Sequence, residues 1–470
     1  MRTKGETASG GEEMKVKVKR KFLAWLGLVT LFFALPASSA TKDEFILSCA
    51  PTALNGVASR HGMTVLTSVD SRNIFLVRGP AGASPTQLVD EVEADSDVGL
   101  FEPNRDVLVP ESPAGLKLNQ STASVLDTLG TPSAITFFGS SVLSSYVNQP
   151  AAVLIRRAET HQFLATGVGI VAVIDTGVDP NHPVLKNSLI PGFDFTRNLP
   201  GIPSEFADLS QSTASILDQS MASILDQNTV VLLNQSTASI LDQSTASILD
   251  TTQVPQAFGH GTMVAGIIHL VAPTAQIMPL KAFRADGSSN LFDILRAVYF
   301  AVDHGAKVIN MSFSFAGPSE ELMRAMNFAS ERGVVCVSST GNLGKETLAF
   351  PASFQNVLGV ASTNNLDVRS TFSNFGAALA DMAAPGEAII STFPGKHYAA
   401  AWGTSFSTPF VSGAVALLVQ AKPTIDPKDV YGSLSHTKKL NSTEMGWGRL
   451  DVYRAVAHKV KILPPGAPAP

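Results

Sequence analysis

The chain has 470 residues, of which 45% are hydrophobic and 16% are charged, compared with roughly 25% charged residues in an average globular protein. This length accommodates two or three domains with a sizeable hydrophobic core. The net charge of −5 and the lack of a basic stripe in the body of the chain argue against a nucleic-acid-binding function.

Residues 1–40 have the three-part pattern of a secretory signal peptide. The basic run MKVKVKRK begins at Met14, the uncharged run FLAWLGLVTLFFAL covers residues 22–35, and the small-residue sequence PASSA ends at Ala40. A membrane span needs about 20 apolar residues, more than this run provides. We therefore predict export with cleavage after Ala40 and no stable membrane anchor, although a single anchoring helix is the alternative. Met14 fits the start of a signal peptide better than Met1.

Residues 42–110 are predicted to form a small α+β domain. Strands are expected in EFILSCA, MTVLTSV, NIFLVRG and the stretch around GLFEPNRDV, and helices in PTALNGVASRHG and SPTQLVDEVEAD. The resulting order, βαββαβ, is that of a ferredoxin-like domain. The polar, Ser-rich stretch 111–150 that follows is interpreted as a linker.

A second domain is predicted for residues 151–458, ahead of a disordered tail at 459–470. Apolar runs typical of buried strands (GIVAVIDTG, QIMPLKAF, AKVINMSFS, GVVCVSS and NVLGVAS) alternate with helical periods (LFDILRAVYFAVDHG and SEELMRAMNFASERG). Such alternation is typical of an α/β fold with a mostly parallel sheet and helices on both faces.

An octad repeat interrupts this second domain. Residues 211–250 comprise QSTASILD, QSMASILD, QNTVVLLN, QSTASILD and QSTASILD, and a further copy, QSTASVLD, occupies residues 120–127 in the linker. A period of eight matches neither the heptad nor the 3.6-residue helical turn. The array is interpreted as a flexible surface insertion. A small β-solenoid or adhesive surface, and a cation site built from its Asp residues, are the alternatives.

Four short segments place a polar side chain where a predicted strand ends or a predicted helix begins. They are Asp175 in VAVIDTGVDP, His260 in FGHGTMVAG, Asn342 in SSTGNLG and Ser405 in WGTSFSTP. Each residue also has a purely structural interpretation: a turn Asp, a capping or core His, a loop Asn and a helix-capping Ser.

Taken together, these residue types support nucleophilic catalysis. A serine hydroxyl becomes a good nucleophile when a base such as imidazole takes its proton, and an Asp on the other ring nitrogen fixes the tautomer. A helix N-terminus at Ser405 and the amide of Asn342 can stabilise an oxyanion. Because the carboxyl ends of parallel strands lie along one edge of a sheet, these groups can converge there.

The segments VIDTGVD, GHGTMVAG and GTSFSTP, in this order, resemble the Asp, His and Ser blocks of the subtilisin-like serine proteases. INMSFS and STGN resemble the substrate-wall and oxyanion segments of that family, and the resemblance covers about 167–455 outside the octads. It implies that Asp175 orients His260, that His260 is the general base and then the general acid, and that Ser405 is the nucleophile.

The resemblance further implies that Asn342 donates to the oxyanion and that the substrate-binding residues are Ser312, Phe313 and Ser314. Ser314 stands where the family usually has Gly. The domain at 42–110 resembles the inhibitory prodomain of these enzymes, so a zymogen is expected. Protein or peptide substrates, a monomeric state, secretion and cofactor-free chemistry are also implied, together with structural calcium whose ligands are not assigned to residues here.

The primary hypothesis is therefore a secreted serine endopeptidase of the subtilisin-like class, made as a zymogen. The alternative is a non-catalytic exported protein that binds or adheres through its octads. A metallopeptidase is disfavoured because the sequence lacks HExxH, and an α/β-hydrolase esterase because it lacks GxSxG.

Overall fold

The computed structural model describes residues 43–69, 71–109, 133–209, 230–232, 255–460 and 465–470, with the backbone alone described for 230–232. All of them belong to one unit of the chain, Ala40–Pro470. The predicted signal peptide, the octad at 120–127, and the octad array except for residues 230–232 lie outside the described residues.

The N-terminal domain is an antiparallel sheet covered by two helices. Its elements are β1 (Glu44–Cys49), α1 (Leu54–Arg60), β2 (Thr64–Ser68), β3 (Ile74–Arg78), α2 (Pro85–Glu93) and β4 (Val98–Pro103), with strand order β2-β3-β1-β4. The rings of Phe45 and Phe101 stack at 4.8 Å in the core of this domain. The predicted βαββαβ order is therefore confirmed.

Residues 133–150 fold against the second domain, instead of forming part of the predicted linker. They contain β6 (Ala134–Phe137), β7 (Ser140–Leu143) and α4 (Ser144–Val147), followed by α5 (Pro150–Leu154) and α6 (Arg157–Phe163). Tyr146 is fully buried, and its hydroxyl donates to the Gly266 carbonyl at 2.7 Å. The few apolar side chains of this stretch are enough to anchor it, although serines dominate its composition.

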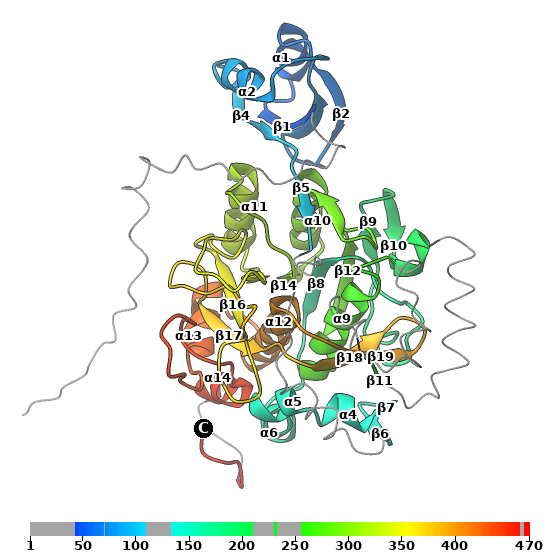
Figure 1. Cartoon of the computed structure of the whole chain (residues 1–470), viewed down its shortest axis with the longest axis vertical. Coiled ribbons are helices and arrows are strands. Elements are labelled where there is room, and N and C mark those ends of the chain that lie inside the picture. The colour runs from blue at the N-terminus through cyan, green and yellow to red at the C-terminus, as the bar shows by residue number, and fades with distance from the viewer. Residues whose placement is uncertain (1–42, 70, 110–132, 210–229, 233–254, 461–464) are drawn as a thin grey trace, which may run out of the picture. The chain divides into compact units, whose positions relative to one another are not determined.

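The second domain contains an eight-stranded sheet with the order β10-β9-β12-β8-β14-β15-β16-β17 (Figure 1). Its strands are β8 (Ile170–Asp175), β9 (Gly192–Asp194), β10 (Leu199–Gly201), β12 (Gln276–Lys281), β14 (Ala306–Met311), β15 (Val335–Ser339), β16 (Val357–Thr363) and β17 (Met382–Pro385). The pairs from β9 to β17 are parallel, and β9 pairs with β10 in the antiparallel sense. The predicted mostly parallel sheet is confirmed.

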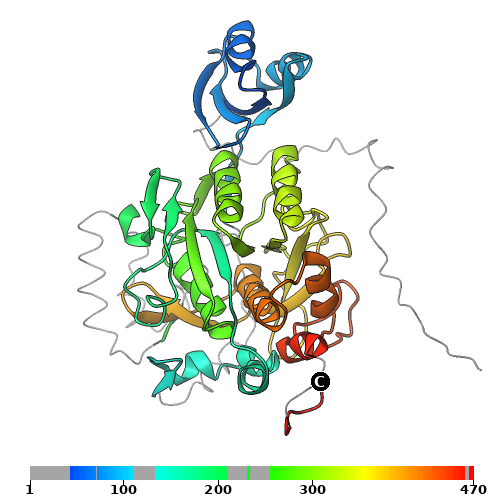
Figure 2. The same ribbon diagram turned by 180° about the vertical axis from the view of Figure 1, so that it is seen from behind.

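Helices cover both faces of this sheet (Figure 1, and from behind in Figure 2). Alternate side chains of β8 enter two different cores: Val171 and Val173 pack with α9 (His260–Val271) and α12 (Thr404–Ala421). Ala172 and Ile174 pack with α10 (Leu291–Asp303) and α11 (Glu320–Glu331). A strand buried on both faces explains why these strands read as continuous apolar runs.

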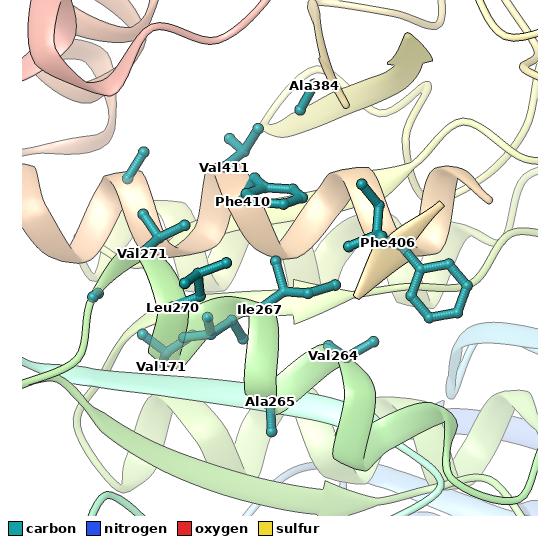
Figure 3. Close-up of a cluster of buried hydrophobic side chains, with 14 of the residues drawn as sticks. Val171, Val264, Ala265, Ile267, Leu270, Val271, Ala384, Phe406, Phe410 and Val411 are labelled. Carbon is teal, nitrogen blue, oxygen red and sulfur yellow. The ribbon is translucent and has the colours of Figure 1, made fainter. Parts of the chain in front are cut away.

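Helix α12 is apolar along its whole length because it lies inside the protein. Figure 3 shows its side chains, among them Phe406 and Phe410, packed over those of α9. By length and composition α12 is also the one helix among the described residues that could cross a membrane, but 89% of that span is buried in the protein interior. It is therefore the core helix of this domain.

The remaining elements join the two domains and complete the edges. They are β5 (Asp106–Leu108), η1 (Glu205–Asp208), β11 (Val230–Leu232), β13 (Ser288–Asn290), β18 (Ile389–Phe393), β19 (His397–Ala401), α13 (Pro427–Leu434) and α14 (Val452–Lys459). The strand β5, which follows the N-terminal domain, pairs antiparallel with β13 of the second domain. From the predicted tail, Pro468 accepts a hydrogen bond from the Tyr453 hydroxyl at 2.7 Å.

Candidate active site

The four residues predicted to take part in catalysis lie where, or just after, central strands end and central helices begin in the second domain. Asp175 is the last residue of β8, and Asn342 lies three positions after the end of β15. His260 is the first residue of α9, and Ser405 is the second residue of α12. This placement follows from the fold, because the carboxyl ends of neighbouring parallel strands share one edge.

Asp175 and His260 form a buried pair. The Oδ1 atom of Asp175 lies 2.7 Å from Nδ1 of His260, and the two residues are 2% and 6% exposed. The same carboxylate oxygen accepts the backbone N–H of Thr176 at 2.7 Å. A carboxylate at Nδ1 places the proton on that nitrogen, so Nε2 is left as the basic atom of the neutral ring.

The glycines beside His260 are required by the close approach of other segments. A Cβ atom at Gly261 would lie 2.1 Å from the carbonyl oxygen of Gly177 and 3.1 Å from Oδ1 of Asp175. Gly259 has a φ of 89°, and a Cβ there would lie 2.1 Å from the ring of Phe393. Glycine at 261 therefore allows α9 to begin close to the end of β8, and glycine at 259 leaves room for the ring of Phe393 in β18.

Ser405 is fully buried and is bound to Ser312 in both directions. The Ser405 hydroxyl donates to the Ser312 carbonyl at 3.0 Å, and the Ser312 hydroxyl donates to the Ser405 carbonyl at 2.9 Å. Pro409 explains the second bond: it has no N–H for the carbonyl four residues earlier, so that carbonyl is satisfied by Ser312. Pro409 lies in the second turn of α12.

A second line of buried hydroxyl and amide groups supports Ser312 from behind. The side-chain amide of Asn310 donates to the Ser312 hydroxyl oxygen at 2.9 Å, and the Ser412 hydroxyl donates to the Asn310 side-chain oxygen at 2.8 Å. All of these residues are buried. The loop after β14 is therefore fixed to α12 at the position of Ser405.

Asn342 is held by the residue that precedes Ser405. Its side-chain oxygen accepts the backbone N–H of Thr404 at 2.9 Å and the Thr404 hydroxyl at 2.8 Å. The Thr404 hydroxyl oxygen in turn accepts the Gly341 N–H at 3.1 Å. Because an amide group is planar, fixing its oxygen also fixes the direction of its N–H groups.

The imidazole also lies close to α12. The rings of His260 and Phe406 have centroids 5.4 Å apart, so His260 lies beside the residue that follows Ser405. The structure thus links Asp175 to His260, and links Ser405 to Ser312 and, through Thr404, to Asn342. In this structure the Ser405 hydroxyl donates its hydrogen bond to the Ser312 carbonyl.

The three expected substrate-binding residues occupy different environments. Ser312 is 1% exposed and Ser314 is half-buried, with its hydroxyl oxygen 2.8 Å from where a Cβ of Gly341 would lie. Phe313 is fully buried and its ring packs on Phe283 at 5.0 Å, and its place in a pocket wall stays a prediction. An apolar ring at the end of a central strand is better accommodated in the core.

Three polar residues around Asp175 and His260 were not predicted. Glu205 is fully buried and accepts hydrogen bonds from the hydroxyls of Thr176 and Thr262 and from the Gly261 N–H. Burial raises the pKa of Glu205 to about 7. The sequence could have indicated the two threonines, because Thr176 directly follows Asp175 and Thr262 is two residues after His260. Glu205 lies just before the octads, and no motif surrounds it.

A metal site is not assigned within the described part of the chain. No group of three or more His, Cys, Asp or Glu side chains there is arranged to hold an ion. The expectations of structural calcium and of cofactor-free chemistry therefore stay predictions.

A parallel α/β sheet that carries Asp, His and Ser, in that chain order, at one set of strand and helix ends defines the class of the protein: a serine protease. The model of the subtilase family matches residues 167–448. The chain therefore belongs to the subtilase family, as the sequence motifs predict.

Curated relatives agree with this assignment. Subtilisin BL of Lederbergia lenta is 37% identical over 197 residues, which cover 40% of this chain and 73% of the relative. Thermitase of Thermoactinomyces vulgaris is 30% identical over 310 residues, which cover 63% of this chain and 91% of the relative. The enzyme is thus a subtilisin-like serine endopeptidase that acts on proteins or peptides.

Solved structures support the fold. Fervidolysin from Fervidobacterium pennivorans, a keratinolytic enzyme related to subtilisin, matches with a TM-score of 0.64 and 21% identity over 90% of this chain and 62% of its own. A lanthipeptide protease matches with a TM-score of 0.51 over 66% of this chain and 95% of its own.

Proposed function

We propose that the protein is a secreted endopeptidase, made as a zymogen, that cleaves peptide bonds through a covalent acyl-enzyme on Ser405. The observation that carries this proposal is the buried Asp175–His260 hydrogen bond of 2.7 Å at the edge where α12 presents Ser405. In this mechanism the Ser405 hydroxyl leaves the Ser312 carbonyl and gives its proton to Nε2 of His260 as its oxygen attacks the substrate carbonyl.

The remaining groups stabilise the charges that form during this attack. Asp175 lies at Nδ1 of His260 and stabilises the imidazolium. The oxyanion receives the backbone N–H of Ser405 at the start of α12 and the side-chain N–H of Asn342, whose direction is set by Thr404. His260 then returns the proton to the leaving amine, and water releases the acyl group by the same sequence of proton transfers.

Contacts between the two domains support the zymogen part of the proposal. The N–H of Val109 donates to the Gly287 carbonyl at 3.0 Å, next to the β5–β13 pair. A Cβ atom at Gly287 would lie 2.7 Å from the side chain of Val109 and 3.3 Å from Ala257, three residues before His260. The chain that leaves the N-terminal domain therefore runs toward the His260 segment, as expected of an inhibitory prodomain that is removed at a bond beyond Val109.

Secretion is supported by the signal-peptide pattern of residues 1–40.

The variants Ser405→Ala and Ser407→Ala test the whole proposal. They form a matched pair because both serines are fully buried in α12 and only Ser405 is the proposed nucleophile. Ser405→Ala is expected to abolish casein hydrolysis and to be secreted with its N-terminal domain attached. Wild type and Ser407→Ala are expected to hydrolyse casein and to begin beyond residue 109, as measured by mass spectrometry. Processing and hydrolysis by the Ser405→Ala variant would refute the assignment.

A further inference from the structure

Glu205 connects the two segments that supply Asp175 and His260. Its Oε1 atom accepts the Thr176 hydroxyl at 2.5 Å and the Gly261 N–H at 3.2 Å, and its Oε2 atom accepts the Thr262 hydroxyl. Thr176 follows Asp175, and Gly261 follows His260. A single carboxylate with no solvent exposure therefore holds the end of β8 against the start of α9.

This carboxylate also takes the place of the missing cap of α9. The N-cap residue is Gly259, which has no side chain to accept the first N–H groups of the helix. The Gly261 N–H is instead accepted by Glu205 and by the Thr176 hydroxyl oxygen, the latter at 3.0 Å. A negative charge here is favoured by the helix dipole.

Backbone donors fix the direction of the hydrogen bonds around Glu205. The Asp179 N–H donates to the Thr262 hydroxyl oxygen at 2.8 Å, so the Thr262 proton is available for Glu205. The Gly261 N–H likewise donates to the Thr176 oxygen. The Thr176 hydroxyl has one proton and two carboxylate oxygens within reach: Glu205 at 2.5 Å and Asp175 at 3.2 Å. Which carboxylate accepts the hydrogen bond from this hydroxyl depends on the charge of Glu205.

The charged groups around Glu205 shift its ionisation in opposite directions. Burial is the main cause that raises its pKa to about 7; the charge of Asp175 raises it further and that of Lys281 lowers it. Lys281 donates to the Thr176 carbonyl at 2.6 Å and to Asp208 at 2.7 Å, and Asp208 also binds Arg197. His260, at the start of α9, and Asp179, whose N–H binds Thr262, are the other titratable residues of this network.

We propose that Glu205 is a positioning residue that sets, through the hydroxyl of Thr176, how strongly Asp175 supports His260. When Glu205 is ionised, it accepts the hydrogen bond from the Thr176 hydroxyl, so this hydroxyl does not compete with His260 for the Asp175 carboxylate. When Glu205 takes up a proton from solvent, it donates to the Thr176 oxygen, and the Thr176 proton turns to Asp175. That additional hydrogen bond and the loss of one negative charge weaken the stabilisation of the imidazolium. The inference rests on the proposed role of His260.

The test uses Glu205→Gln, which keeps the side-chain shape and is neutral at every pH, in the full chain. In the Ser405→Ala background, where autolysis is not expected, the Nδ1 proton of His260 is followed by NMR as a function of pH. We expect Glu205→Gln to remove a titration step near neutral pH from this signal and to lower the pKa of His260 by about one unit. With Ser405 present, kcat above pH 8 should fall roughly 3- to 10-fold at unchanged KM.

Two variants at Thr176 separate positioning from structural support. Thr176→Val removes the hydroxyl and should remove the same titration step, whereas Thr176→Ser should keep it. In a double-mutant cycle, the effect of Glu205→Gln on the pKa of His260 should be smaller by about half or more in the Thr176→Val background.

Three results would overturn the inference: a His260 titration unchanged by Glu205→Gln, an equal shift with and without the Thr176 hydroxyl, or a loss of kcat that is the same at every pH. If Glu205→Gln does not fold, the comparison of Thr176→Val with Thr176→Ser decides alone. Because the NMR titration needs no turnover, its outcome is independent of whether Ser405 is the nucleophile.

Discussion

Single residues define this site through what they do to neighbouring backbone groups. Pro409 withholds an N–H from the Ser405 carbonyl, and Ser312 satisfies that carbonyl instead. Thr404 is the first residue of α12, and its N–H donates to the side-chain oxygen of Asn342, which sets the orientation of that amide. Ser312 and Thr404 therefore each fix the position of a residue that we assign to catalysis.

Asn342 offers the sharpest residue-scale prediction. Replacement by Asp keeps an oxygen for Thr404 but removes the N–H donor and adds a negative charge where the oxyanion forms. We expect Asn342→Asp and Asn342→Leu to lower kcat by roughly 10²–10³, the factor known for one side-chain oxyanion donor in subtilisin, with little change in KM. Steady-state kinetics on a small peptide measure this, and a kcat within twofold of wild type in both variants would remove Asn342 from the oxyanion site.

Site residues can be predicted from the sequence where a reactive side chain stands within a recognisable motif. They cannot be predicted where a residue joins the site only through contacts with segments distant in the chain. Asp175 and His260 could be predicted because each is a polar residue at the end of an apolar strand or the start of an apolar helix, beside glycines, where packing alone would favour an apolar side chain. Glu205 could not, because its partners are 29 and 57 positions away and its own segment reads as an ordinary loop. The packing of the Phe313 ring against Phe283 could not be predicted either, because position along the chain does not show which way a ring packs.

At the scale of elements, α11 makes a buried polar contact with the N-terminal domain. Its N-cap residue, Ser319, donates to the carboxylate of Glu102 in β4 at 2.7 Å, and the N–H of Glu321 donates to the same oxygen at 3.1 Å. Glu102 and Glu321 are 8% and 2% exposed. Burial raises the pKa of both carboxyls, that of Glu321 to about 7, and the charge of Glu102 adds to this shift.

These raised pKa values predict that the interface weakens as the pH rises. A carboxyl whose pKa is higher in the folded state contributes stability that is complete below its ordinary pKa of 4.5 and is lost as the pH rises through about 7. For Glu321 this loss amounts to at most about 3 kcal/mol. We expect the thermal unfolding midpoint of the unprocessed Ser405→Ala chain to be lower at pH 8 than at pH 5.

The variant Glu321→Gln should reduce this fall, because glutamine is neutral at both pH values. The neighbouring Glu320 provides a matched control, since its side chain is 54% exposed. Glu320→Gln should leave the pH dependence as in the unprocessed Ser405→Ala parent. If Glu321→Gln and Glu320→Gln show the same pH dependence of the unfolding midpoint, the buried carboxyl of Glu321 does not cause the loss of stability.

Element order was predictable from the sequence because the strands of the second domain are buried on both faces and its helices carry clear end signals. Asn290 and Ser319 cap α10 and α11, and Gly305 and Gly333 follow them with φ values of 80° and 75°. The segment 133–150 was harder to place. Its apolar residues are separated by serines, and their burial depends on contacts with α9 and β18 that are distant in sequence.

For the whole molecule, the octad array is a long segment between the residues Asp175 and His260. It enlarges the interval between Asp175 and His260 to 85 residues, yet the two side chains still lie within hydrogen-bonding distance. Within the array, β11 pairs in parallel with β19, with Val230 opposite Tyr398. A protein fold tolerates such an insertion because lengthening a surface loop costs little entropy.

Replacing residues 211–250 by a short Gly-Ser linker should therefore leave hydrolysis of a small chromogenic peptide within about threefold of wild type, since the groups assigned to catalysis lie outside the array. Loss of the β11–β19 pairing should appear mainly as a lower unfolding midpoint. A control that deletes the same residues and adds back only the octad 227–234 should recover that midpoint. Abolished peptide hydrolysis by a folded deletion variant would mean that the octads contribute to the active site.

Covalent trapping of the nucleophile is the most direct test of the central claim. The mature protein is treated with a fluorophosphonate, digested and analysed by mass spectrometry. We predict one adduct, located on Ser405, which is lost when His260 is replaced by Ala or when the protein is denatured before labelling. An adduct on another residue, or full inhibition of peptide hydrolysis with Ser405 unmodified, would contradict the proposed mechanism.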